Sequence, residues 1–255
     1  MEVWRLLDTE ALDSAAMNLA IEEAIFLERI RRKVPPTVRF WRNRRAAVIG
    51  YSQKVEAEVN LRLCRAEGIE IVRRFSGGGA VYQDLGNLNY TLVLDADHPI
   101  IEGLDIRESY RVLTAGVVEG LKEFGIDLVF DPPSDLLAGE RKLSGNAQSR
   151  KKRTIFHHGT LLVNADLHLL AEVLDATGDG PKNNKITSEK RPVTNLADEI
   201  GRHVDMQEVK LALHRGFETA FSVKLVRRQL GPEEEESAHA FYAEKYSRRE
   251  WNFWR

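Results

Sequence analysis

The stretch RRFSGGGAVYQDLGN, residues 73–87, decides the fold assignment of this chain. It lies between two segments typical of β-strands, residues 69–72 and 88–94. Three consecutive glycines give up side-chain packing, and they allow backbone N–H groups to approach an anion closely. The two adjacent arginines add positive charge and forked donors suited to phosphate or carboxylate. We interpret the stretch as an anion-binding loop; the alternative is a glycine hairpin with two solvated arginines.

Composition limits the class of protein. At 255 residues the chain can form one large domain or two small ones and can bury a full core. Its net charge of −2 gives no bulk attraction to nucleic acid or membrane, and no apolar stretch reaches the roughly 20 residues that span a bilayer. Cys64 is the only cysteine, which excludes internal disulfides and cysteine-based zinc sites. Because the first residues lack a secretory pattern, we expect a cytoplasmic protein.

The spacing of apolar residues predicts one α+β domain with a mixed, largely antiparallel sheet flanked by helices. A first helix follows Asp13 or Ser14 as its cap, and Pro35-Pro36 ends that region. Later helices are predicted over residues 107–124, ended by Gly125, and over 166–174, 206–221 and 234–246. Strands are predicted over residues 37–41, 46–51, 69–73, 80–83, 88–94, 126–130, 141–147 and 154–163. Residues 178–191 are predicted to be a long loop.

A second cluster, residues 141–148, surrounds Lys142. Leu143 alternates with small or polar neighbours, which predicts a strand that presents Lys142 on one face. A lysine ammonium can hold a carboxylate and a phosphate together and can stabilise the charge that develops as an acyl phosphate forms. Taken alone, this lysine is more typical of an exposed strand residue.

Two further clusters follow in the chain. His157 and His158 are adjacent in a predicted strand, so their side chains point to opposite faces; we expect one to pack inward and hydrogen-bond rather than a shared metal ion. Residues 149–153, SRKKR, are predicted to form a solvated hairpin tip that could also close over a phosphate or meet an acidic partner. The chain has no P-loop motif, no GxGxxG after a strand and no GxSxG.

Together these clusters resemble the lipoate–protein ligase A family, within the wider biotin/lipoate ligase superfamily. Residues 73–87 resemble the family signature RRxSGGGxVxHDxGN, residues 142–147 its KxSGxA element and residues 157–162 its HHGTLL element. Residues 17–23, 41–53, 194–196 and 245–253 resemble further family segments in the same order. The resemblance covers almost the whole chain, and several motifs in one order are more specific than one glycine loop.

The resemblance implies an enzyme with two half-reactions. Lipoate and ATP, with Mg²⁺, would give lipoyl-adenylate and pyrophosphate. The lipoyl group would then pass to a lysine of a lipoyl carrier domain, in the glycine cleavage H protein or a 2-oxoacid dehydrogenase acyltransferase subunit. Lys142 would be the catalytic residue, bridging the carboxylate and the α-phosphate. The resemblance assigns substrate and adenylate binding to Trp41, Arg74, Ser76, Gly77, Gly78, Gly79, Asp84, Asn87, Asp135, Gly145, Ala147, His158, Gly159 and Thr160.

Three departures from the family pattern qualify this expectation. Gln83 stands where the family has the histidine of VxHD, and Ser134-Asp135 replaces an Asn-Asp pair. The chain ends at Arg255, where full-length bacterial ligases continue into an accessory domain that two-part systems supply as a separate small protein. We therefore expect residues 1–255 to be a single catalytic domain that binds lipoyl-adenylate but activates lipoate poorly without a separate accessory protein.

Other functions remain open on the same fold. An octanoyl transferase would act through a cysteine thioester, and such relatives place that cysteine shortly before the lysine strand, where residues 128–135 contain none. Cys64 lies in a segment predicted to be helical, residues 60–68, where a structural thiol is expected. A non-catalytic binder would not need Lys142 beside the arginine–glycine loop. Biotin ligation is disfavoured, because RRFSGGG replaces the GRGRxGRxW loop of the biotin enzymes.

Overall fold

The structure, a computed structural model, describes residues 1–176 and 192–255, so the loop predicted over residues 178–191 lies outside the described residues. The strands are β1 (Glu2–Asp8), β2 (Thr37–Trp41), β3 (Arg45–Ile49), β4 (Glu70–Arg73), β5 (Val81–Asp84), β6 (Asn87–Asp95), β7 (Leu128–Asp131), β8 (Asp135–Ala138), β9 (Arg141–Lys151), β10 (Thr154–Leu162) and β11 (Val223–Arg227). The α-helices are α1 (Ala15–Ile30), α2 (Val55–Glu58), α3 (Leu61–Ala66), α4 (Ile106–Leu113), α5 (Ala115–Leu121), α6 (Leu167–Val173), α7 (Leu196–Ile200), α8 (Met206–Phe221), α9 (Pro232–Phe241) and α10 (Arg249–Asn252).

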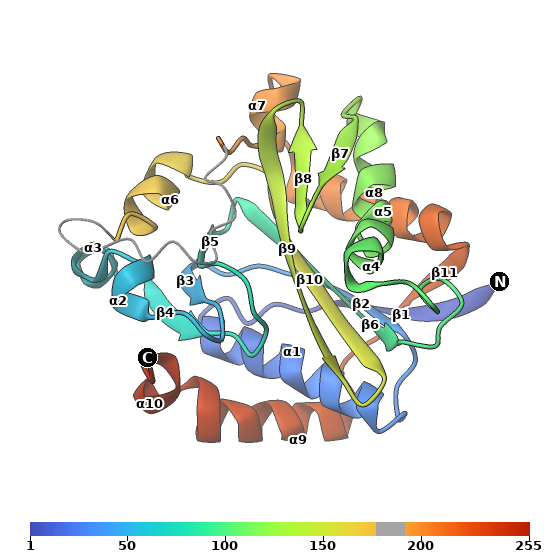
Figure 1. The fold of residues 1–255 in the computed structure, drawn as a ribbon, viewed down its shortest axis with the longest axis horizontal. Helices are drawn as coiled ribbons and strands as arrows, with labels where there is room; N and C mark the ends of the chain where they lie inside the picture. The colour runs from blue at the N-terminus through green and yellow to red at the C-terminus, as the bar shows by residue number, and fades with distance from the viewer. Residues whose placement is uncertain (177–191) are drawn as a thin grey trace.

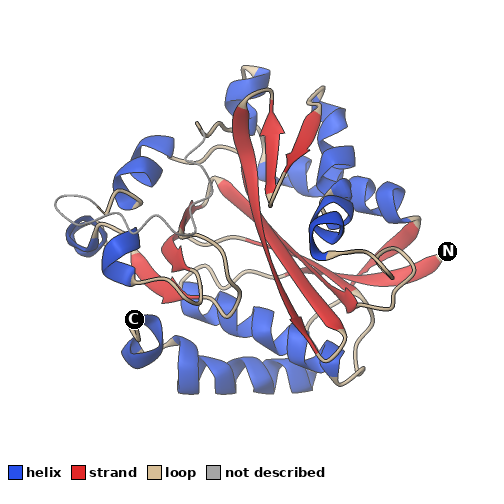
Figure 2. Ribbon diagram, in the orientation of Figure 1, coloured by secondary structure: helices blue, strands red, loops and turns tan. Residues whose placement is uncertain are grey.

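Two sheets form the framework of the molecule (Figures 1 and 2). The larger sheet has eight strands in the order β11-β1-β2-β6-β10-β9-β8-β7, and the smaller has three in the order β4-β3-β5. Strand β1 runs parallel to β2 and β11, and β3 runs parallel to β4. The other paired strands are antiparallel. The predicted α+β class with a mixed, largely antiparallel sheet is confirmed.

Helices cover both faces of the larger sheet, with α1 and α9 on one side and α5 and α8 on the other (Figure 1). The alternation of β6 explains this layering, because Leu92 packs in the cluster under α5 and α8 while Val93 packs in the cluster under α1. Glycines let α5 and α8 approach closely. A Cβ atom on Gly216 would lie 2.3 Å from the carbonyl oxygen of Gly116.

The smaller sheet has its own apolar cluster, shared with α2, α3 and α6. Cys64 on α3 is buried in this cluster beside Ala47 of β3 and Tyr82 of β5. Burial raises the pKa of its thiol. The segment around Cys64 is therefore helical as predicted, and its thiol packs as a structural group.

Local signals fixed some helix ends and missed others. Ser14 caps α1, since its side chain accepts a hydrogen bond from the backbone N–H of Met17. The helix predicted over residues 107–124 is interrupted at Thr114, whose hydroxyl donates to the carbonyl oxygen of Tyr110. Its end at Gly125 is as predicted, with a left-handed φ of 73°. The last predicted helix begins at α9 and ends in one π-helical turn, Tyr242–Tyr246.

Three strands, β1, β8 and β11, were not predicted. Strand β1 takes its partners from residues far away in the chain, because it pairs in parallel with β11 at the other end of the sequence. Strand β8 is short and follows Pro132-Pro133. Pairings of this kind leave little trace in local periodicity.

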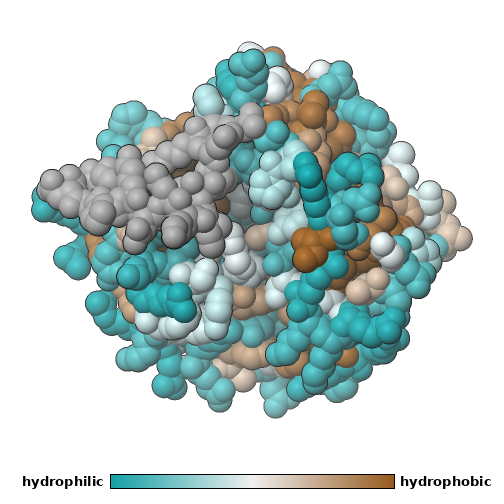
Figure 3. Space-filling view, in the orientation of Figure 1, coloured by the Kyte–Doolittle hydropathy of each residue, from teal (hydrophilic) through white to brown (hydrophobic). Residues whose placement is uncertain are grey.

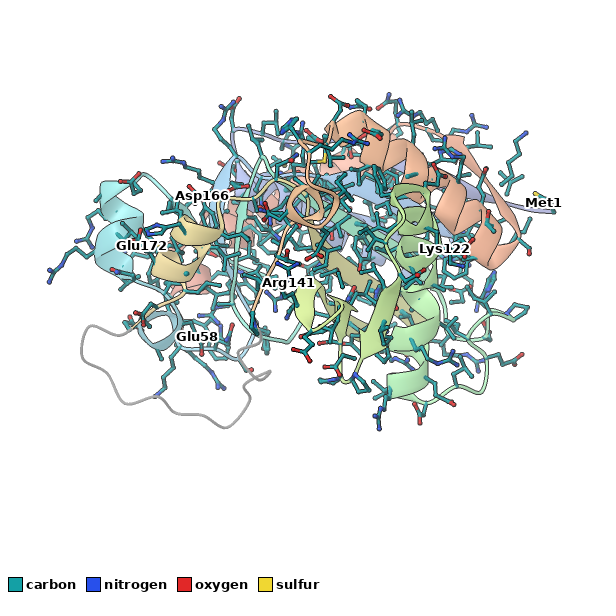
Figure 4. All side chains as sticks on the ribbon, turned by 90° about the horizontal axis from the view of Figure 1, so that it is seen from above. Met1, Glu58, Lys122, Arg141, Asp166 and Glu172 are labelled. Atoms are coloured by element: carbon teal, nitrogen blue, oxygen red, sulfur yellow. The ribbon has the colours of Figure 1, made fainter. Side chains whose placement is uncertain are left out.

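The surface and the helices give three further observations. Apolar side chains gather over β7, α4 and α5 on the face shown in Figure 3. Two large apolar side chains of these elements, Ile106 of α4 and Val129 of β7, are exposed. In the perpendicular view of Figure 4, Arg141 at the start of β9 lies between Glu58 and Glu172 on one side and Lys122 on the other. Within the described residues, no helix is both long and apolar enough to span a bilayer.

Candidate active site

One row of residues crosses five strands of the larger sheet and lines a cavity of about 170 Å³. Trp41 on β2 is paired with Asn89 on β6, and Asn89 is paired with Thr160 on β10. Thr160 is in turn paired with Gly145 on β9, and Gly145 with Asp135 on β8. The strand pairing therefore brings together residues separated by more than 100 positions in the sequence.

The rest of the cavity wall comes from the glycine loop, the smaller sheet, α1, the turn before β8, and further residues of β9 and β10. These further lining residues are Leu19, Val48, Arg74, Gly78, Gly79, Ala80, Val81, Gln83, Pro133, Ser134, Lys142, Asn146, Ala147, His158 and Gly159. Most of the residues expected to bind substrate thus surround one cavity. Their binding roles remain predictions.

Lys142 lines the cavity and forms an ion pair with Asp135. Its Nζ lies 2.8 Å from Asp135 Oδ1, and its side chain is 24% exposed. Its backbone is fixed from the other side, because its N–H donates to the carbonyl oxygen of Pro192 and its own carbonyl accepts from the N–H of Thr194. The lysine is anchored at its backbone while its ammonium group remains accessible.

A β-bulge aims the Lys142 side chain. The register of β9 against β8 shifts at Leu143, which adds one residue to β9. Strict alternation would place Lys142 and Gly145 on opposite faces, and the bulge places both at the cavity. A Cβ atom on Gly145 would lie 2.9 Å from Lys142 Nζ, so glycine provides the space that the lysine occupies.

Arg74 holds the glycine loop in shape. Its guanidinium donates to the carbonyl oxygens of Gly77 at 2.6 Å, Gly79 at 2.8 Å and Val48 at 3.3 Å. Gly78 has a φ of 89°, and a Cβ atom there would lie 2.9 Å from Arg74 Nη2. Burial lowers the pKa of Arg74 to about 10, so the group still carries its charge at neutral pH. Gly77 contributes its carbonyl to this arrangement and does not line the cavity.

The sequence motif predicts that Arg73 and Arg74 act together as donors to an anion, and the structure shows that this is wrong for Arg73. Its side chain is fully buried and points away from the cavity. It donates to the carbonyl oxygens of Gly50, Tyr51, Gln53 and Asn252. These oxygens come from the segment after β3 and from α10, so Arg73 joins the glycine loop to the C-terminal helix and offers no charge to a ligand.

Ser76 acts on the cavity through His158. The Ser76 hydroxyl lies 2.7 Å from His158 Nε2, and His158 Nδ1 lies 3.5 Å from Glu22 Oε2. Glu22 also pairs with Arg39 at 2.9 Å. Burial raises the pKa of Glu22, but the hydrogen bond from His158 and the charge of Arg39 outweigh it and leave the pKa lowered. Burial lowers the pKa of His158, partly offset by Glu22, so a neutral His158 faces the cavity.

Asp84 and Asn87 build the turn between β5 and β6 and do not line the cavity. Asp84 Oδ1 accepts from the N–H of Gly86 at 2.8 Å, and its Oδ2 accepts from the N–H of Asp166 at 3.0 Å. Asn87 Oδ1 accepts from the N–H of Asp84 at 2.8 Å. Both side chains stabilise this turn, and that of Asp84 also stabilises the start of the segment at Asp166. The binding role expected of them from the sequence remains a prediction.

Among the cavity residues not predicted as site residues, Gln83 and Asn89 form a buried polar network. Gln83 Nε2 donates to Asn89 Oδ1 at 2.7 Å and to Thr160 Oγ1 at 2.8 Å. The available signal was the alternation of β6, in which Asn89 and Thr91 share one face of a strand whose other face is apolar. Buried polar residues on one face of a central strand indicate a polar network or a ligand.

The two adjacent histidines face opposite sides of β10, as predicted. His157 is fully buried, and its Nδ1 lies 3.1 Å from Gln148 Nε2. Burial, with a smaller contribution from His158, lowers the pKa of His157 to about 3. Within residues 1–176 and 192–255, no cluster of three His, Cys, Asp or Glu side chains could hold a metal ion.

The basic segment 149–153 forms the end of the β9–β10 hairpin, as predicted. Lys152 and Arg153 take left-handed φ values of 47° and 61° at the turn. Arg153 contacts Asp97 at 3.1 Å, and Arg150 donates to the Ser109 hydroxyl. These side chains do not line the cavity.

Comparison with known proteins assigns the family. The family described as "Lipoyl protein ligase A/B catalytic domain" matches residues 14–218. Lipoate-protein ligase A subunit 1 of Thermoplasma acidophilum is 33% identical over 97% of this chain and 95% of its own length. Octanoyltransferase LipM of Brevibacillus brevis is 32% identical over 99% of both chains.

Solved structures agree with this assignment. A structure described as a bi-partite lipoate protein ligase and its E2 lipoyl domain from Thermoplasma acidophilum has a TM-score of 0.86 at 33% identity and covers 99% of this chain and 97% of that one. A lipoate-protein ligase A bound with ATP has a TM-score of 0.84 at 33% identity, with 99% of both chains covered. The family match, the similar chains and the shared fold show that this chain belongs to the lipoyl protein ligase A/B catalytic domain family.

Proposed function

We propose that this chain is the catalytic subunit of a lipoate–protein ligase, which activates lipoate with ATP and passes the lipoyl group to a lysine of a lipoyl carrier domain. The observation that carries the proposal is the placement of Lys142, ion-paired with Asp135 at 2.8 Å, at a cavity that Arg74 and the glycine loop also line. Two cations at one cavity suit a substrate that brings both a carboxylate and phosphates.

In the first step a carboxylate oxygen of lipoate attacks the α-phosphorus of ATP. A new C–O–P linkage forms, the bond to the pyrophosphate oxygen breaks, and lipoyl-adenylate remains. Negative charge gathers on the phosphoryl oxygens, where the Lys142 ammonium would stabilise it after exchanging Asp135 for the substrate. Asp135 is the carboxylate in the described cavity wall, so Mg²⁺ would be held mainly by the ATP phosphates and water.

In the second step the amine of a carrier lysine attacks the lipoyl carbonyl. The amide bond forms, the bond from the carbonyl carbon to the AMP oxygen breaks, and the amine loses a proton. The mixed anhydride supplies its own leaving group, so the protein contributes positioning and charge stabilisation. The E2 lipoyl domain named with the Thermoplasma acidophilum ligase is a carrier of this kind.

A separate accessory protein belongs to the proposal. The relative from Thermoplasma acidophilum is a subunit 1, and the corresponding ligase is described as bi-partite. We expect the present chain to bind lipoyl-adenylate by itself and to activate lipoate efficiently only with such a partner. Strong pyrophosphate release from lipoate and ATP by the purified chain would refute this requirement.

The second candidate function is octanoyl transfer, favoured by the similarity to Octanoyltransferase LipM. A thioester route needs an activated thiolate at the cavity. Cys64 is buried in the cluster of the smaller sheet, burial raises its pKa, and it does not line the cavity. As no other cysteine exists in the sequence, this observation favours the ligase.

One set of parallel reactions separates the two functions. The chain is incubated with a lipoyl carrier domain and either lipoate plus ATP, with and without the accessory protein, or octanoyl acyl carrier protein without ATP. Modification of the carrier lysine is followed by intact-protein mass spectrometry. The ligase gives a lipoyl adduct that depends on ATP, and octanoyl transfer in the ATP-free reaction would overturn the proposal.

A further inference from the structure

A row of four buried side-chain amides leads from α1 to the cavity. Asn18 Nδ2 donates to Asn43 Oδ1 at 2.9 Å, and Asn43 Nδ2 donates to Gln83 Oε1 at 2.8 Å. Gln83 Nε2 then donates to Asn89 Oδ1 at 2.7 Å. Each of these residues is at most 4% exposed. Each of the first three amides therefore donates a hydrogen bond to the next amide toward the cavity.

Asn18, the first amide of the row, fixes the direction in which the amides donate. Asn18 Oδ1 accepts from the backbone N–H of Ala11 at 3.0 Å and from Arg39 Nη2 at 2.9 Å, and neither group can act as an acceptor. Turning one amide round would place two NH₂ groups face to face. Because burial makes an unmet polar contact costly, the whole row keeps one orientation.

The row of amides ends at Asn89, whose side-chain NH₂ group is a hydrogen-bond donor without a partner in the described part of the protein. Asn89 Oδ1 accepts from Gln83 and also from Thr160 Oγ1 at 2.7 Å, so it is the Nδ2 that remains. Nδ2 is buried and has no hydrogen-bond partner among residues 1–176 and 192–255. The residue is 1% exposed and lines the cavity. An acceptor on the occupant of the cavity would satisfy it.

The strand register places this donor away from Lys142. Asn89 on β6 is paired with Thr160 on β10, and Thr160 with Gly145 on β9, the residue over which the Lys142 ammonium lies. Two strand spacings separate Asn89 from Gly145, which is about 10 Å. An extended eight-carbon acid whose carboxyl group meets Lys142 covers a distance on the order of 9 Å. Its far end therefore reaches the neighbourhood of Asn89.

We propose that Asn89 is a specificity-determining residue that favours an acyl chain with an acceptor near its far end over a plain alkyl chain. This inference rests on the proposed function and names its substrate class more closely. Lipoate carries sulfur atoms on its sixth and eighth carbons, and sulfur accepts hydrogen bonds weakly. Octanoate offers no acceptor there and would leave Asn89 Nδ2 unpaired.

The test measures kcat/KM for lipoate and for octanoate in ATP-dependent carrier acylation, with the accessory protein present. In Asn89→Leu, which keeps the side-chain volume and removes the donor, the ratio of lipoate to octanoate should fall about five- to tenfold. Asn60→Ser, which changes an asparagine that caps α3 away from the cavity, should leave the ratio unchanged. An unchanged ratio in Asn89→Leu would overturn the inference.

A second measurement uses the wild-type chain and remains decisive if the variant does not fold. Isothermal titration compares octanoate with 8-hydroxyoctanoate, whose terminal oxygen is a stronger acceptor. If the cavity had no unpaired donor, it would bind 8-hydroxyoctanoate more weakly than octanoate, because the hydroxyl group would lose its water without gaining a hydrogen bond. We expect it to bind at least as tightly as octanoate, and tenfold weaker binding would contradict the inference. Failure to bind or activate either lipoate or octanoate would refute the proposed function itself, whereas equal use of both would refute only the role of Asn89.

Discussion

Two ion pairs differ in their relation to the cavity. Lys142 and Asp135 pair in the cavity wall, and the lysine side chain is 24% exposed. Arg39 and Glu22 pair at 2.9 Å behind the wall, where both side chains are almost completely buried. Arg39 also starts the row of amides that ends at Asn89. The Lys142 ammonium is accessible to a ligand that could replace Asp135 as its partner, whereas neither member of the Arg39–Glu22 pair is accessible.

The two pairs therefore suit different tasks: the Lys142–Asp135 pair is placed to contact a substrate, and the Arg39–Glu22 pair holds cavity residues in position. In the Lys142–Asp135 pair, the partly exposed ammonium can bind a carboxylate or phosphate of a ligand in place of Asp135. The buried pair orients Trp41 through Thr91, which bonds both Glu22 and the Trp41 indole, and it orients His158 directly, since His158 Nδ1 lies 3.5 Å from Glu22 Oε2. Substitution of Lys142 should therefore lower reaction rates first, and substitution in the Arg39–Glu22 pair should lower stability first.

The largest expected effect is on catalysis, from Lys142→Ala. Loss of the ammonium should lower the rate of carrier lipoylation by on the order of 10²- to 10³-fold or more. Lys151→Ala provides a matched control, because Lys151 is an exposed lysine at the far end of the same strand. Circular dichroism melts should show both variants folded. A wild-type rate from Lys142→Ala would show that the Lys142 ammonium does not contribute to catalysis.

The second effect is on stability, from Glu22→Leu. Arg39 would lose the carboxylate that balances its buried charge, and the free energy of unfolding should fall by about 3–5 kcal/mol. Urea unfolding measures this value. Glu208→Leu breaks an exposed pair with Arg202 and should leave the free energy of unfolding nearly unchanged. Equal losses of unfolding free energy in the two variants would show that the Arg39–Glu22 pair does not stabilise the fold.

The smallest effect is a pH dependence that His157 adds from the core side of β10. Its folded-state pKa is about 3, whereas the unfolded chain takes up the proton near 6.5. Between these values the unfolded state binds more protons, so stability falls as the pH falls, by up to about 1.4 kcal/mol per pH unit. Between about pH 6 and pH 5, wild type should lose more unfolding free energy than His157→Gln. Parallel curves for the two proteins would mean that His157 is not held neutral by the fold.

The sequence identified the residues around Lys142 better than a residue whose partners come from distant parts of the chain. Lys142, Gly145 and Asp135 stand in local motifs, so a family resemblance could assign them. The burial of Arg73 depends on carbonyl oxygens near Gly50 and Asn252, which approach only in the folded chain. No local pattern distinguishes it from Arg74, and its expected role was wrong for that reason.

Contacts between distant parts of the sequence also explain the other differences between the predicted and the observed site. Asn89 reaches the cavity because β6 lies between β2 and β10, and the parallel pair of β1 and β11 joins the two ends of the chain. Such placements follow from sheet order, which local periodicity does not specify. Asp84 and Asn87 belong to the signature motif, yet their side chains bond to the backbone of their own turn and of Asp166.

Transfer from preformed lipoyl-adenylate tests the central claim most directly, because it bypasses activation and any need for the accessory protein. The purified chain is mixed with lipoyl-adenylate and a lipoyl carrier domain, without ATP, and the mass of the carrier is followed with time. We predict that the carrier lysine gains one lipoyl group in the presence of the wild-type chain, well above the rate without protein. Carrier modification that occurs only from octanoyl acyl carrier protein, with none from lipoyl-adenylate, would contradict the assignment of this cavity to an acyl-adenylate.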